Sequence, residues 1–200
     1  MPRRFVRGLL ATLLLTVSLP VAAQPGALTI SRNLQHLTER AATIVRGQVL
    51  SARVERHPQL GGLHTVVVTL RVRETLKGAA GATYTFRQYI WDLRDRHDAA
   101  GYRKGDDLLL MMIEPSAYGL SSPAGMDQGR FRIRREHDGR EMAVDGRGNW
   151  RLFDGLAAKL AEQGRALSSE SAGLVTVHRS GPVDAAALRR LILELEREDR

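Results

Sequence analysis

The chain has 200 residues, no cysteine and a formal net charge of +8 at pH 7. A chain of this length forms one domain with a single core, and the missing cysteine excludes disulfide cross-links, a lipoprotein anchor and a thiol nucleophile. Nearly all of the positive charge is arginine. A GC-rich genome produces this bias without selection for any ligand, although arginine is also the better donor to an anion.

Residues 1–23 have the pattern of an export signal. A basic start is followed by an apolar run at 8–21 and by small residues that suit signal peptidase. We expect cleavage between Ala23 and Gln24, which leaves residues 24–200 as a single exported domain, periplasmic or secreted. An uncleaved anchor is the weaker alternative, because the apolar run is shorter than the roughly 20 residues that span a bilayer.

The first elements of the exported chain are a short helix and two long strands. Leucines at helical spacing predict an amphipathic helix over 32–42, with Ser31 as its N-cap. Strict alternation of apolar and polar residues over 43–78 predicts two strands joined by a turn-rich loop. Within the first strand, Gly47 indicates a bulge or bend where the sheet curls.

Three further segments follow the second strand. The stretch 83–91 alternates as a third strand with an unusually aromatic outer face. Residues 92–104 are charged and predict a solvated loop. Residues 108–113 are six consecutive apolar residues, a pattern typical of a central strand that is covered on both faces.

The remaining chain combines a loop, a hairpin and helices. Residues 115–129 form a long irregular connection, a type of loop that is often functional or mobile. Two strands at 130–134 and 142–144 are joined by a hairpin turn. Beyond them, Asp154 and Asp184 are placed as N-caps of two helices, whereas the polar segment between these helices has no clear pattern.

These elements predict a mainly β fold with flanking helices. The helix and five or six antiparallel strands in 31–146 favour a small OB-like barrel, because long curled strands close it and remove the sheet edges. Residues 147–200 would form a helical C-terminal extension that includes an amphipathic helix. A small two-sheet β-sandwich is the alternative.

Four motifs within the predicted barrel also resemble known proteins. They are Ile44-Val45-Arg46-Gly47-Gln48-Val49, Glu74-Thr75-Leu76-Lys77-Gly78, Gly105-Asp106-Asp107-Leu108-Leu109-Leu110 and Gly129-Arg130-Phe131-Arg132-Ile133. The set resembles a loose group of small exported bacterial proteins of unknown function. More distantly, the layout is similar to the netrin-like domain of tissue inhibitors of metalloproteinases, an OB barrel. Those inhibitors chelate a protease metal through an N-terminal cysteine that this chain lacks, so the resemblance implies fold and not inhibition.

Neither metal binding nor catalysis is indicated by a motif. His57 and His64 flank the first strand loop without a third ligand, and we expect both to be exposed. The acidic loop with Asp92, Asp95, His97 and Asp98 lacks the spacing of a calcium loop and is interrupted by arginines. Ser121 and Ser122 have no nucleophile elbow. We therefore assign no catalytic, metal or cofactor residue and expect no cofactor.

One surface is a candidate for binding. It is the outer face of the second and third strands, with Arg71, Arg73, Arg87, Tyr89 and Trp91. OB-like barrels use such guanidinium groups and rings to hold extended polymers. The alternative is that the terminal helices cover this face and that the rings belong to the core.

The sequence therefore favours a non-catalytic periplasmic or secreted binding module, which uses the arginine-aromatic face or the 115–129 loop. An envelope protein, a peptide or an acidic glycan would suit this compartment as partner, whereas nucleic acid would not, and no membrane anchor remains after cleavage. A protease-inhibitor-like or accessory protein is one alternative. A metal-dependent hydrolase is a second and weaker one.

Overall fold

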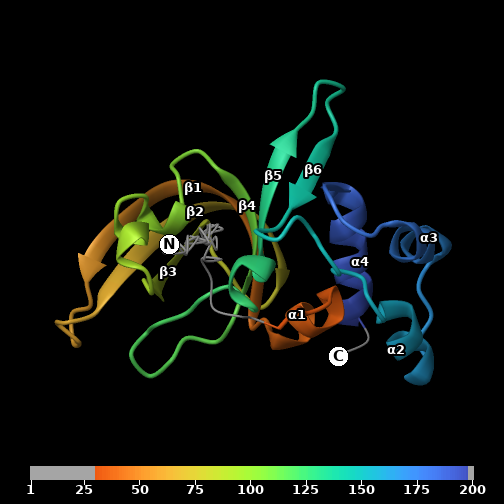
Figure 1. Cartoon of the computed structure of the whole chain (residues 1–200), viewed down its shortest axis with the longest axis horizontal. Helices are drawn as coiled ribbons and strands as arrows, with labels where there is room; N and C mark the ends of the chain where they lie inside the picture. Colours follow the sequence, from red (N-terminus) through yellow and green to blue (C-terminus); the bar gives the residue numbers. More distant parts are fainter. Residues whose placement is uncertain (1–29, 198–200) are drawn as a thin grey trace, which may run out of the picture.

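A computed structural model describes residues 30–197 (Figure 1). The predicted signal peptide and its cleavage site between Ala23 and Gln24 lie outside the described residues. Within 30–197, none of the helices has both the length and the apolar character needed to cross a membrane.

Seven strands form one sheet in the order β3-β2-β1-β4-β5-β6-β7, and each neighbouring pair is antiparallel. The strands are β1 (Thr43–Arg56), β2 (His64–Lys77), β3 (Thr83–Tyr89), β4 (Asp107–Met112), β5 (Arg130–Arg135), β6 (Glu141–Val144) and β7 (Val183–Asp184). The helices are α1 (Leu34–Arg40), α2 (Leu156–Glu162), α3 (Ser169–Val177) and α4 (Ala185–Arg197). Three short 3-10 segments complete the described chain: η1 (Leu93–Arg96), η2 (Ala99–Gly101) and η3 (Met126–Gly129).

The predicted OB-like barrel of five or six strands is wrong, because the sheet is open and has seven strands. It runs from β3 at one edge to β7 at the other. The sandwich alternative is wrong as well, since a single sheet contains every named strand of the described chain. The strands need no closure to bury their apolar residues: helices cover one face, and the curled strands cover much of the other (Figure 1). The prediction of a mainly β fold with a C-terminal helix is confirmed.

Two apolar cores lie on opposite faces of the sheet, and β4 contributes to both. Leu109 and Met111 belong to the core that includes the buried leucines of α1, α2 and α4. Leu108, Leu110 and Met112 belong to the second core, which contains the valines of β1 and β2 together with Phe86, Ile90 and Tyr102. The apolar run in β4 is therefore covered on both faces, as its unbroken pattern predicted.

The two long strands pair along most of their length, with register shifts that bend the hairpin. Each has 14 residues, and one of the three shifts falls between Arg46 and Gly47. A β-carbon at Gly47 would come within 2.5 Å of the Arg71 carbonyl oxygen. Gly47 therefore permits a close approach of the β1 and β2 backbones at the bend, which confirms the predicted bulge.

Helix starts depart from the sequence prediction at two of three sites. Asn33, not Ser31, caps α1, since its side chain accepts a hydrogen bond of 3.0 Å from the His36 amide. Gly155, in a left-handed conformation, and not Asp154, precedes α2. Asp184 caps α4 as predicted and accepts a 2.9 Å bond from the Ala187 amide. The polar segment without a clear pattern contains α3.

Substitution of Gly47 tests the bend. We expect Gly47→Ala to lower the free energy of unfolding by about 2 kcal/mol, because the added methyl group must push two paired strands apart. Gly61→Ala is the matched control, since a β-carbon there meets no atom within 4 Å. Urea unfolding measures both variants. Equal stability of the two would contradict the close-approach role of Gly47.

Candidate functional site

The predicted binding face divides into parts with different surroundings. Arg73 and Arg87 form ion pairs with carboxylates. Arg71 is exposed and has no ion-pair partner among the residues that the structure describes. Tyr89 and Trp91 contact each other at the end of β3, with ring centroids 4.8 Å apart. Trp91 is 74% exposed, so the terminal helices do not cover it and it is not a core residue.

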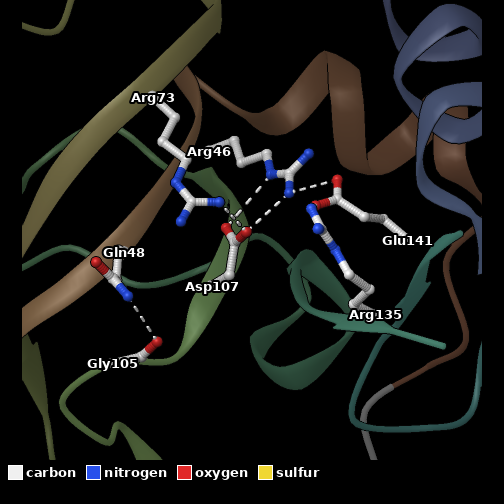
Figure 2. A network of polar contacts seen from close by, with 7 residues as sticks. All are labelled: Arg46, Gln48, Arg73, Gly105, Asp107, Arg135 and Glu141. Atoms are coloured by element: carbon white, nitrogen blue, oxygen red, sulfur yellow. Dashed lines mark hydrogen bonds and ion pairs between the residues drawn. The ribbon is translucent and has the colours of Figure 1, made fainter. Parts of the chain in front are cut away.

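Arg73 belongs to a network that joins five strands (Figure 2). Asp107 accepts hydrogen bonds from Arg46 and Arg73 at 2.7 and 2.6 Å. Arg46 also donates to Glu141 at 2.7 Å, and Arg135 pairs with the other oxygen of that carboxylate at 3.1 Å. The hydrogen bond from Arg46 is the main reason that the pKa of Glu141 is lowered. These contacts give Arg73 a structural role, because they place its charge against Asp107.

Arg87 is held in a similar way. One nitrogen of its guanidinium donates to Glu55 at 2.6 Å and the other to the Thr65 hydroxyl at 2.9 Å. Thr65 is fully buried. Arg71 is thus the member of the predicted arginine set whose charge remains uncompensated within residues 30–197.

A cavity of about 220 Å³ lies beside Tyr89 and Trp91. Its walls come from the end of β3, from the η1–η2 loop and from the segment around η3. The lining residues are Gln88, Tyr89, Trp91, Asp95, Asp98, Ala100, Gly101, Pro123, Met126, Asp127 and Arg130. This cavity, called here the Trp91 pocket, brings together the end of β3 and the end of the 115–129 connection, the two candidate binding regions of the sequence.

Arg130 lines the pocket and packs on Tyr102, a residue of the second core. Tyr102 is 3% exposed, and the Arg130 guanidinium carbon lies 4.6 Å from the centre of its ring. Burial raises the pKa of Tyr102 to about 12, so the phenol stays neutral and donates to Gln88 at 2.8 Å. Arg130 also donates to the Ala100 carbonyl at 2.7 Å and pairs with Asp127 at 2.6 Å. The positive charge of Arg130 is therefore compensated by neighbouring groups of the pocket wall.

The backbone beside the pocket adopts a strained conformation. Ala99 and Ala100 have φ values of 53° and 55°, in the left-handed region that residues with a β-carbon seldom occupy. Arg130 and Arg132 hold this segment by donating to the carbonyls of Ala100 and Gly101, each at 2.7 Å. Strain of this kind persists only where surrounding contacts impose it, and it concentrates at binding and catalytic sites.

The pocket is acidic. Asp127 is paired with Arg130, and Asp98 caps the 3-10 turn by accepting a bond from the Gly101 amide at 3.2 Å. Asp95 has neither an ion pair nor a side-chain hydrogen bond with any described residue. Burial raises the pKa of Asp95, and the charges of Asp92, Asp98 and Asp127 raise it further. The charge of the neighbouring Arg94, whose guanidinium is already paired with Asp92, lowers the pKa by less. Asp95 is thus a partly desolvated carboxylate that forms no ion pair of its own with a described residue.

The side chains considered as metal ligands do not form a metal site in the described residues. Asp92, the first residue of the predicted acidic loop, caps η1 and bonds the side chain of Arg94. In the part of the chain that the structure describes, no group of three or more histidine, aspartate or glutamate side chains is arranged to hold a metal ion.

The prediction that His57 is exposed is wrong. The side chain is 2% exposed because the 115–129 connection packs over it. Its Nδ1 accepts hydrogen bonds from the amides of Gln59 and Leu60, so Nε2 carries the proton and donates to the Tyr118 carbonyl at 2.9 Å. His57 therefore attaches this connection to the tip of the β1–β2 hairpin.

Sequence reasoning located the rings but missed the residues that complete the pocket. Tyr102 was the available signal, since an aromatic residue in an otherwise charged loop indicates a segment that folds back onto the core. Asp127 and Arg130 gave no signal of their own. Comparison of the chain with protein-family models, with curated proteins and with solved structures gave no match. The function must therefore be inferred from the geometry of the pocket.

Removal of the Asp107 carboxylate tests the structural role assigned to Arg73. We expect Asp107→Asn to lower the free energy of unfolding by about 2–3 kcal/mol, because the Asp107 side chain is only 15% exposed and two guanidinium groups lose the negative charge that compensates them. Asp138→Asn makes the same chemical change in an exposed pair with Arg140 and should leave the stability nearly unchanged. Thermal and urea unfolding compare them. A loss of equal size in both variants would contradict a structural network.

Proposed function

We propose that the protein is a non-catalytic binding module of the bacterial periplasm or extracellular space, which takes its ligand in the Trp91 pocket. The export-signal pattern supports the compartment. The observation that carries the binding role is an exposed tryptophan that contacts a second ring beside a cavity, in which the Asp95 carboxylate forms no ion pair with a described residue. Exposed aromatic rings next to a few convergent polar groups are typical of ligand sites, and tryptophan and tyrosine are favoured anchors at interfaces.

Among the partners expected for this compartment, a peptide segment of an envelope protein fits better than an acidic glycan. Arg73 and Arg87 are already paired with carboxylates, so they offer little charge to an anion. The pocket itself presents aspartates. A volume of about 220 Å³ also suits one side chain or a small organic group rather than a polymer strand.

The two alternatives have no observation in their favour within the described residues. The inhibitor-like reading depended on a barrel layout, and the sheet is open. The hydrolase reading needs a site that the described histidines and carboxylates do not form.

Peptide selection tests the proposal. Immobilised protein is exposed to a displayed library of random peptides, in parallel with Trp91→Ala and with the control Trp150→Ala, whose ring is exposed but does not line the pocket. We expect a common peptide motif to be enriched on the wild type and on the Trp150 variant and to disappear on the Trp91 variant. Failure to enrich any motif on the wild type, or equal enrichment on all three, would contradict binding at the pocket.

A further inference from the structure

We infer that the Trp91 pocket recognises an organic cation, a primary ammonium or a guanidinium group carried by a basic peptide side chain or by a polyamine. This inference rests on the proposed binding function and names the chemistry of its ligand. Three observations support it: the cavity, the Tyr89–Trp91 ring pair on its wall, and the Asp95 carboxylate, which forms no ion pair with a described residue.

The charges that line the pocket do not balance. Three carboxylates, Asp95, Asp98 and Asp127, face one guanidinium, that of Arg130. Arg130 is fully engaged by Asp127, by the Ala100 carbonyl and by the Tyr102 ring. A carboxylate that is partly removed from water is unfavourable unless a positive group or a hydrogen-bond donor compensates it. The positive charge that acts on Asp95 is that of Arg94, which is already paired with Asp92, and Asp95 forms no ion pair or side-chain hydrogen bond of its own with a described residue. A bound cation would supply that contact.

The aromatic wall suits the same ligand. Tyr89 and Trp91 meet at an interplanar angle of 71°, so their faces are not stacked against each other. Trp91 keeps most of its surface open to solvent. An ammonium or guanidinium group is attracted to the face of a tryptophan ring, and the attraction is strongest for tryptophan among the aromatic residues. One cation placed in the pocket can therefore contact a ring face and the Asp95 carboxylate together.

Other ligand classes fit less well. An anion would face the three carboxylates without a free arginine, because the charge of Arg130 is compensated within the wall. A metal ion would need three or more ligating side chains in one arrangement, and the described residues offer none. A neutral apolar group would leave Asp95 without an ion pair. An organic cation satisfies both the acidic and the aromatic part of the lining.

Calorimetric titration of the purified protein tests this with matched probes. The first is a short glycine-rich peptide with one arginine, the second is the same peptide with citrulline, which keeps the shape and removes the charge, and the third is spermidine. We expect the arginine peptide to bind at least about tenfold more tightly than the citrulline peptide. Trp91→Ala and Asp95→Asn should each weaken binding by about tenfold. Asp138→Asn, which neutralises a distant exposed carboxylate, should leave binding unchanged.

The outcomes separate the ligand sources and the two proposals. Binding of spermidine but not of the arginine peptide, with the same dependence on Trp91 and Asp95, assigns the cation to a polyamine. Equal binding of the arginine and citrulline peptides overturns cation recognition but leaves the pocket as a peptide site. No Trp91-dependent binding of any cationic probe, while library peptides still require Trp91, also overturns this inference alone. If library peptides do not require Trp91 either, the proposed function fails with it.

Discussion

The burial of β4 on both faces is the constraint on which the rest of the structure depends. All five residues from Leu108 to Met112 are buried, and their side chains alternate between two separate cores. One face has to be covered by helices, and α1 and α4 provide the cover. The other face has to be covered without helices, and the bend of the β1–β2 hairpin at Gly47 folds the sheet over it. An open sheet therefore buries its apolar residues without closing into a barrel.

The second core also determines where the pocket forms. The β1–β2 hairpin does not cover the whole face, and Tyr102 fills the remaining space against Phe86, with ring centroids 5.5 Å apart. Placing Tyr102 there draws the η1–η2 loop back across the sheet. Arg130 packs on the Tyr102 ring and holds the strained backbone at Ala100. The loop therefore presents its aspartates beside Trp91 as a consequence of core packing.

Local structure could be predicted from the sequence where periodicity was strong. The bounds of β1 and β2 follow from alternation of side chains, and the start of α4 follows from the cap at Asp184. Closure of the sheet could not be predicted, because alternation says which face is buried and not whether two edges meet. A strand as short as β7 has no period to detect.

The charge partners of Arg73 and Arg87 could not be predicted from the sequence either, since the Arg73–Asp107 contact joins positions 34 residues apart. Tyr89 and Trp91 were found because their side chains are unusual in an outward strand position, but the aspartates beside them depend on the path of two loops.

The chain contains two tryptophans, Trp91 at the pocket and Trp150 outside it, so the indole N–H signals in a proton–nitrogen NMR spectrum report the site and an internal control together. Titration with N-acetyl-arginine amide tests directly whether the Trp91 pocket is a binding site for a cationic group. We predict a saturable shift of the Trp91 signal while the Trp150 signal stays in place. An unchanged Trp91 signal, or equal shifts of both signals, would contradict it.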